Sequence, residues 1–273
     1  MISLKRNSKG QLVEAKGIRT RKHSRYRPNQ QESFKISRSK FENFLTCQRC
    51  FYLDRVKGLI SPSIPGWTLN ETTDMLLKKE FDYCREKQIP HRIFKRNGLD
   101  NIVPYKHHSL DNWRDSLHGG LKYEPAYSNI ILHGGVDDIC LDLDKNELIV
   151  LEFKSQASRL PVTTEYYLKG YYRDSYKRQI DFYVYLLSGL GFEVSEIAYF
   201  YVCNANRNAS YFRGEMLFDE VLIPYKWDIS WIDDQIIEMM KILNTEHIPE
   251  LNQSCENCAY SNQRFLMENN LSV

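Results

Sequence analysis

Two neighbouring segments of the sequence place acidic residues and a lysine among apolar residues. The first runs from His133 to Asp142 and contains Asp137, and the second runs from Leu148 to Lys154 and contains Glu152. β-branched and apolar residues flank a polar turn between the two segments, so we expect two short buried strands. Side chains two residues apart on a strand point to the same face, so Glu152 and Lys154 should enter one cleft.

The acidic residues of these two strands should lie in an apolar interior. Buried carboxylates are unfavourable unless a cation compensates their charge. Carboxylates around a hard divalent cation, with a lysine nearby, are what phosphodiester hydrolysis requires, because the metal activates water and the lysine orients it or stabilises the pentavalent phosphorus. Glu-x-Lys alone is common on solvated strands, but the other residues from Leu148 to Phe153 are all apolar. We therefore expect a divalent metal; the alternative, a salt-bridge network with Lys154, would leave negative charge uncompensated.

Two helices before these strands are expected to position further residues. The first should run from Ser39, which opens a capping box, to about Lys57. The second should run from Thr68 to about Lys87 and bury a stripe that includes Leu77. Asp74 lies three residues before Leu77 on the same line and is therefore a candidate site residue. The alternative is that the helix dipole favours an acid in the first turns.

A third helix is expected after the strands, from about Tyr172 to Ser188. Beside its apolar stripe it carries a polar and aromatic one, formed by Tyr172, Tyr176, Gln179 and Tyr183. Most core helices have only the apolar stripe. The tyrosines could stack on the bases of a single nucleic-acid strand, or they could pack with their hydroxyls at the rim of the core.

The remaining elements are read from shorter patterns. We expect a short helix around Leu110 to Leu117, a loop from Ser155 to Lys169, strands from Glu196 to Cys203 and from about Phe212 to Ile223, a helix from about Ile229 to Leu243, and a short polar tail after the last cysteine. Strands and helices mixed in this way indicate an α/β fold.

Four of the seven cysteines form two C-x-x-C pairs. Cys47 and Cys50 lie on the first expected helix, and Cys255 and Cys258 lie near the end of the chain. Four thiols are the ligand count of a closed tetrahedral sulfur site, which would link distant parts of the chain. The alternative is four free thiols. The other three cysteines, Cys84, Cys140 and Cys203, read as core residues.

Composition indicates a soluble globular protein. Of the 273 residues, 42% are hydrophobic, and no apolar run reaches transmembrane length. The sequence has no secretory leader, so a cytoplasmic location is expected. The net charge of +2 hides a charge of +8 on the first 30 residues. We expect a basic flexible arm over residues 1–33, either a solvated tail or a contact for a polyanion, and a single domain over residues 34–273.

The order of these motifs resembles the PD-(D/E)XK nuclease superfamily. The resemblance rests on Ser37-Arg38-Ser39-Lys40-Phe41 leading to Cys47-Gln48-Arg49-Cys50-Phe51-Tyr52-Leu53, then Gly135-Val136-Asp137-Asp138, Glu152-Phe153-Lys154 and Gln179-x-x-x-Tyr183. It is closest to the RecB-like branch, which includes AddB-type and CRISPR-associated exonucleases, and it spans residues 37 to 260. The resemblance implies a restriction-endonuclease-like core with a central mixed sheet flanked by helices.

The resemblance also implies roles for individual residues. Asp137 and Glu152 would bind Mg²⁺ or Mn²⁺, the Phe153 carbonyl would be a further ligand, and Lys154 would be catalytic. Gln179 and Tyr183, with Tyr176 of the same stripe, would contact the substrate strand. The family places a metal-binding histidine on the preceding helix; this chain has none there, and Asp74 is the best equivalent. An oxygen ligand suits Mg²⁺ or Mn²⁺ at least as well.

For the cysteines, the resemblance implies a [4Fe-4S] cluster. The family pattern has one early and three late cysteines, whereas this chain has two and two, so Zn²⁺ stays open. The expected function is a metal-dependent DNA nuclease, an exonuclease or single-strand-processing enzyme of repair, recombination or defence. It would act on single strands or duplex ends of DNA, with no membrane partner. The alternative is a nucleic-acid-binding or assembly protein on the same fold with impaired catalysis.

Overall fold

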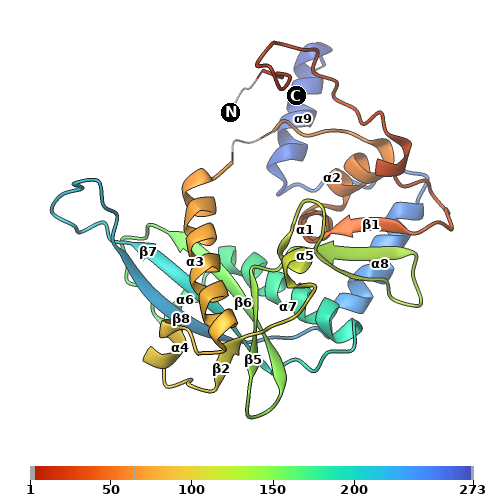
Figure 1. Cartoon of the computed structure of the whole chain (residues 1–273). Helices are drawn as coiled ribbons and strands as arrows, with labels where there is room; N and C mark the ends of the chain where they lie inside the picture. The colour runs from red at the N-terminus through yellow and green to blue at the C-terminus, as the bar shows by residue number, and fades with distance from the viewer. Residues whose placement is uncertain (1–3, 64–65, 272–273) are drawn as a thin grey trace. The chain divides into compact units, whose positions relative to one another are not determined.

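The computed structural model describes residues 4–63 and 66–271, which form a mixed α/β protein (Figure 1). The described residues divide into two compact units. The first unit takes residues up to 66, residues 126–130 and residues from 233 onward. The second unit takes residues 67–125 and 131–232.

A five-stranded mixed sheet is the centre of the second unit. Its strands, in spatial order, are β2 (Ile102–Pro104), β5 (Asp138–Asp142), β6 (Glu147–Gln156), β7 (Ile197–Ala205) and β8 (Phe218–Lys226). Only the pair β6–β7 is parallel, and all other neighbours are antiparallel. The expected strand pair around the acidic residues is therefore present as β5 and β6, in the middle of the sheet.

Strand β6 is buried on both faces because helices cover both. Its residues Ile149, Leu151 and Phe153 join one core cluster with Leu77 and Phe81 of α3 (Thr68–Lys87). The alternate residues of β6 face α7 (Asp174–Gly189), which lies on the other side of the sheet (Figure 1). The alternation thus directs apolar side chains toward α3 and Glu152 and Lys154 toward α7.

The first of the two expected strands is in fact two strands. β4 (Ile130–Gly134) ends before Gly135 and pairs with β3 (Leu121–Tyr123), whereas β5 begins only at Asp138. Gly135 is needed at this break, because a Cβ there would lie 2.7 Å from backbone atoms of Ser116. The prediction of one continuous strand was wrong because this contact bends the chain between the two strands.

Helices dominate the first unit. It contains β1 (Phe34–Ser37), α1 (Arg38–Thr46), α2 (Gln48–Tyr52), a π-helical turn (Leu53–Lys57), nearly all of α8 (Ile232–Asn244), and α9 (Glu256–Glu268). The single helix expected from Ser39 to Lys57 is therefore broken at Cys47. Its N-cap is Ser37, whose hydroxyl accepts from the backbone N–H of Lys40, and not Ser39.

Part of the basic N-terminal stretch is packed within the first unit. Tyr26 is buried, and its hydroxyl donates to the Asn244 side chain at 3.0 Å. Arg19 pairs with the buried carboxylate of Asp54 at 2.7 Å, and Lys40 and Arg55 contact the same carboxylate. Although burial raises the pKa of Asp54, these three cations lower it to about 2. The cationic stretch therefore includes residues with defined partners.

Other predicted boundaries shift by a few residues. The structure adds η1 (Lys22–Ser24), α4 (Arg92–Arg96), α6 (Thr164–Tyr167) and η3 (Tyr171–Arg173), shortens the helix near Leu110 to α5 (Leu110–Arg114), and replaces the expected polar tail by α9. β8 starts at Phe218, because residues 206–217 form a loop after β7. No helix in the described part of the chain has both the length and the apolar character needed to span a membrane.

Candidate metal centres

The acidic centre lies in the second unit, where β5 separates from β6. The last paired residues at this end are Asp138 and Leu151. Asp137 therefore precedes β5 and is not on a strand, which corrects the prediction. Its Oδ2 accepts a hydrogen bond from the backbone N–H of Phe153 at 2.8 Å. The carboxylate thus accepts the hydrogen bond that a backbone carbonyl of a neighbouring strand would otherwise accept. This bond holds Asp137 at the point where β5 and β6 separate.

Glu152 and Lys154 meet on the face of β6 that α7 covers, as their spacing predicts. Lys154 Nζ donates to Glu152 Oε1 at 2.7 Å and to Gln179 Oε1 at 3.0 Å. Gln179 Nε2 donates to the same Glu152 oxygen at 2.6 Å. One oxygen of Glu152 therefore has two donors, and the three side chains hold one another in place.

The second oxygen of Glu152 has no hydrogen-bond donor although it is buried. Burial, followed by the nearby Asp137 carboxylate, raises the pKa of Glu152 to about 8, even though Lys154 opposes the rise. A buried carboxylate oxygen without a donor is unfavourable unless a cation compensates it. Its chemistry, a hard oxygen beside a second carboxylate, fits Mg²⁺ or Mn²⁺.

Asp74 faces the same centre from α3. It is half-buried; burial, and then the charge of Asp137, raise the pKa of Asp74 to about 7. Asp74 is the seventh residue of α3, and the acid in the first turn is Glu71, so the helix dipole does not account for its position. Lys78, one turn further along α3, lies 3.9 Å from Asp137 Oδ1.

The acidic side chains are close, but they are not gathered around one point. Within residues 4–63 and 66–271, only the four cysteines form a group of three or more metal-ligating side chains whose atoms all lie within 4.8 Å of one another. A cation shared by Asp74, Asp137 and Glu152 would therefore require a side-chain adjustment. Phe153 is buried against Phe81, with ring centroids 5.4 Å apart, and the role of its carbonyl as a ligand stays a prediction.

Asp138, the neighbour of Asp137 in the sequence, has a different environment. It is fully buried and pairs with Arg85, while Arg114 lies 3.5 Å from its second oxygen. Burial raises the pKa of Asp138, and the two arginines lower it. This carboxylate already has its cations, so Asp138 belongs to the packing of the second unit and not to the acidic centre.

The tyrosines of the polar and aromatic stripe have different positions. Tyr183 is buried, and its hydroxyl donates to the Gly135 carbonyl at 2.6 Å, which fixes the turn that carries Asp137. The Tyr176 ring lies 4.4 Å from Lys154 Nζ. Tyr172 precedes α7 and is exposed. Part of this stripe therefore supports the acidic centre. The sequence alone did not decide whether these tyrosines pack or contact a nucleic-acid strand.

Arg173 also belongs to this region, although the sequence patterns did not predict it as a site residue. Its guanidinium lies 4.3 Å from the Tyr167 ring and 5.0 Å from the Tyr176 ring, and it donates to the Gln156 side chain at 2.6 Å. Its Nε is buried without a partner. The available signal was the run of tyrosines on both sides of a single arginine, a composition that favours cation–π contacts.

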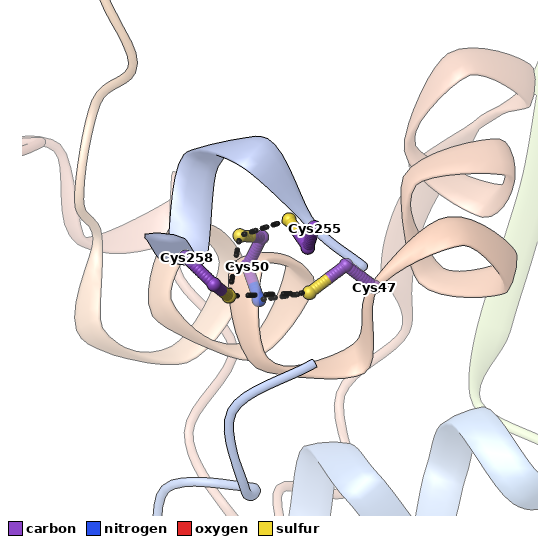
Figure 2. Close-up of side chains that lie close together, drawn as sticks. All are labelled: Cys47, Cys50, Cys255 and Cys258. Atoms are coloured by element: carbon purple, nitrogen blue, oxygen red, sulfur yellow. Dashed lines mark hydrogen bonds between the residues drawn. The ribbon is translucent and has the colours of Figure 1, made fainter. Parts of the chain in front are cut away.

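The second centre is the cysteine cluster of the first unit. Figure 2 shows the four sulfurs directed toward one another, from the junction of α1 and α2 and from the start of α9. Cys47 Sγ lies 3.6 Å from Cys258 Sγ, and Cys50 Sγ lies 3.6 Å from Cys258 Sγ and 3.7 Å from Cys255 Sγ. The predicted grouping of the two C-x-x-C pairs is confirmed.

Local structure explains how the first pair is presented. Cys47 ends α1 and is the N-cap of α2, with its sulfur accepting from the backbone N–H of Cys50 at 3.5 Å. Burial raises the pKa of both Cys47 and Cys50. Although burial opposes it, the backbone N–H of Cys258 lowers the pKa of Cys255. Metal binding needs thiolates, and Cys255 is the thiol that ionises most readily among these three.

Hydrogen bonds hold the late cysteine pair against the early one. Arg49 donates to the Pro249 carbonyl at 2.8 Å, Tyr52 donates to the Thr245 carbonyl at 3.0 Å, and Asn252 donates to the Thr46 carbonyl at 3.1 Å. These bonds fasten the segment before α9 to α1 and α2. The cluster could bind a metal such as Zn²⁺ or an iron–sulfur centre.

Comparison of the chain with protein-family models, curated proteins and solved structures gave no match.

Proposed function

We propose that this chain is a Mg²⁺- or Mn²⁺-dependent DNA nuclease with a restriction-endonuclease-like core. The observation that carries the proposal is Glu152, a buried carboxylate with two donors on one oxygen and none on the other. The charge of Asp137 acts on Glu152, and the bonded oxygen of Glu152 fixes the ammonium of Lys154. A carboxylate pair with a positioned cation suits phosphodiester hydrolysis.

Each residue has a distinct role in this proposal. Glu152, Asp137 and Asp74 would hold the cation, which supplies a water of lowered pKa and neutralises charge on the phosphate. Burial lowers the pKa of Lys154, but the Glu152 and Asp137 carboxylates outweigh burial and raise it, which favours the ammonium form. Its Nζ would orient the attacking water or stabilise the pentavalent phosphorus. Gln179 positions both Glu152 and Lys154.

The test is a nuclease assay with labelled single-stranded and duplex DNA in Mg²⁺ and in Mn²⁺. We expect Glu152→Gln and Lys154→Ala to lower cleavage by at least about a hundredfold to a thousandfold, because each removes a group that acts on the transition state. Glu147→Gln, at the other end of β6, is the matched control and should cleave as the parent does. Full activity in both site variants, with unchanged folding by circular dichroism, would refute the proposal.

A second candidate function is nucleic-acid binding without cleavage. It is favoured by the spacing of the three carboxylates, which in the described chain do not form a compact ligand group as the cysteines do. A Mn²⁺ titration followed by cleavage assays separates the two functions. Binding of Mn²⁺ that Glu152→Gln abolishes, without hydrolysis of any DNA or RNA, would favour this candidate.

For the cysteine cluster, the sulfur spacing favours a single tetrahedral ion such as Zn²⁺. Around one ion with metal–sulfur distances of about 2.3 Å, tetrahedral sulfurs lie about 3.8 Å apart. The closest sulfur pairs here are 3.6 Å and 3.7 Å apart. A [4Fe-4S] cluster inserts iron and sulfide between the thiolates and needs them farther apart. Anaerobic purification with metal analysis and an absorption spectrum distinguishes the two, because only the iron cluster is brown.

A further inference from the structure

A hollow of the second unit lies near the acidic centre, at the C-terminal end of β6. It is a pocket of about 670 Å³ between the start of α3, the end of β6 and the loop after β7. Its lining includes Trp67 and Asn70 on one side, Ser155 and Gln156 at the base, and Tyr211 and Phe212 on the loop. This volume is within the range of pockets that hold small organic groups.

The walls of the pocket are aromatic and exposed. Trp67 is 75% exposed, Phe212 is 67% exposed and Tyr211 is 63% exposed. Large apolar side chains clustered at a surface mark a binding site more often than packing. Aromatic rings offer flat faces, and a flat π-system is the group that would cover them best.

Polar and cationic groups accompany these rings. Arg213 lies over the Tyr211 ring at 4.0 Å, and Arg207 extends along the pocket to the Ala157 carbonyl at 3.4 Å. Asn70 offers a side-chain amide, and Ser155 Oγ is buried without a partner. One carboxylate, Glu215, also lines the pocket. The pocket therefore suits a flat polar ring with an anionic group attached.

The pocket continues the acidic centre along β6. Ser155 and Gln156, which line the pocket, follow Lys154 directly on β6. Thr73 lines the pocket and precedes Asp74, and Asn70 donates to the Ser155 carbonyl at 3.4 Å. A base in this pocket therefore belongs to a nucleotide close along the strand to the phosphate at Lys154.

We propose that this pocket binds an unpaired base of the nucleic-acid strand whose phosphate lies at the acidic centre. Trp67, Tyr211 and Phe212 stack on the base, the amide of Asn70 meets its edge, and Arg207 meets the adjoining phosphate. A base in a duplex is covered by its neighbours, so the pocket selects single-stranded nucleic acid or a frayed end. The identity of the occupant rests on the proposed function.

An abasic scan tests the pocket. Affinity is measured by fluorescence anisotropy with labelled oligothymidylates, each with one base removed, and Ca²⁺ replaces Mg²⁺ so that binding is measured without cleavage. We expect removal of one particular base, or of two adjacent ones, to weaken binding by about 5-fold to 150-fold, the range of one base–aromatic stack. Trp67→Ala and Phe212→Ala should weaken binding of the intact strand similarly.

The decisive measurement combines the removal of one base from the oligonucleotide with the substitution of an aromatic residue in the protein. In Trp67→Ala, removal of the sensitive base should cause little further loss, because its partner is already absent. Tyr83→Ala is the matched control, an aromatic residue on α3 that is 59% exposed and does not line this pocket, and it should keep the parent's abasic profile. A flat profile in the parent, or an unchanged profile in Trp67→Ala, would overturn the proposal.

This readout separates the pocket from the nuclease activity. If the chain shows the position-dependent profile but does not cleave DNA, the proposed base-binding pocket holds and the proposed nuclease function fails. If the chain cleaves single strands but shows a flat profile, the nuclease function holds and the base-binding pocket fails. Trp67 is exposed and makes no side-chain cap to α3, so its replacement should leave folding unchanged.

Discussion

The two candidate metal centres are built in opposite ways. In the cysteine cluster the sulfurs lie mainly against one another, and they come from segments 211 residues apart. In the acidic centre the carboxylates are held by Lys154, Gln179 and the Phe153 backbone, and two of the site residues are neighbours on one strand. Protein groups with hydrogen-bond donors surround the carboxylates, whereas the four thiols face mainly one another, an arrangement that a bound metal would stabilise. A metal should therefore be structural in the first unit and exchangeable in the second.

Removing the cysteine metal should have the largest effect. A structural ion bound by four thiolates contributes about 10 kcal/mol or more to folding. We expect Cys258→Ser to release the metal and to expose α2 and α9 to hydrogen exchange, with the second unit still protected. Metal analysis and hydrogen-exchange mass spectrometry measure both effects.

The control for this prediction is Cys203→Ala, which changes a buried thiol of β7 outside the cluster. It should keep the metal content of the parent. If Cys258→Ser kept both the metal and the protection, the four-thiolate site would be refuted, because the metal would then be held without Cys258.

Asp138 and Asp137 should respond differently to the same substitution. Asp138→Asn breaks a buried pair with Arg85 and Arg114, and the free energy of unfolding should fall by about 3–5 kcal/mol. Asp137→Asn keeps an oxygen for the Phe153 N–H, so stability should change little while Mn²⁺ affinity is lost. Urea unfolding and Mn²⁺ titration of both variants provide the test, and equal destabilisation by the two would contradict it.

The stability of the second unit without divalent ions should fall as pH rises. Glu152, with a folded pKa of about 8 against an ordinary value of 4.5, keeps its proton in the folded state over a range where the unfolded state has lost it. Unfolding therefore becomes more favourable with rising pH between these two values, by a few kcal/mol at most. Asp74, with a pKa of about 7, adds to the same trend.

Urea unfolding across this pH range measures the effect. Glu152→Gln should flatten the pH dependence, and Mn²⁺ should restore stability most strongly at the alkaline end, because the carboxylates are deprotonated there and protons no longer compete with the cation. A stability that rises with pH in the metal-free protein would contradict the assignment of Glu152 as an uncompensated buried carboxylate.

The smallest expected effect concerns Asp74. Asp74→His exchanges a hard oxygen for imidazole, which Mg²⁺ binds less readily than Mn²⁺ does. We expect Mg²⁺-dependent cleavage to fall about tenfold relative to Mn²⁺-dependent cleavage. An unchanged ratio of the two activities would show that Asp74 does not contact the cation.

The sequence predicted those parts of the fold whose signal is local. The alternation along β6 predicts that Glu152 and Lys154 share a face, and the spacing of apolar residues predicts α3 from Thr68 to Lys87. The break before Asp137 was missed because it depends on Ser116, a residue distant in the sequence from Gly135. Tyr183 is held by that same turn, so its burial could not be read from the helix alone.

The arrangement of the first unit has a consequence for synthesis on the ribosome. Cys47 emerges 211 residues before Cys258, and at about 5–20 residues per second it waits about 10 to 40 s for its partner. The second unit, whose last residue is 232, is fully translated before Cys255 and Cys258 are added. A ribosome that stops between these points releases a chain with every residue of the acidic centre and half of its thiolate ligands.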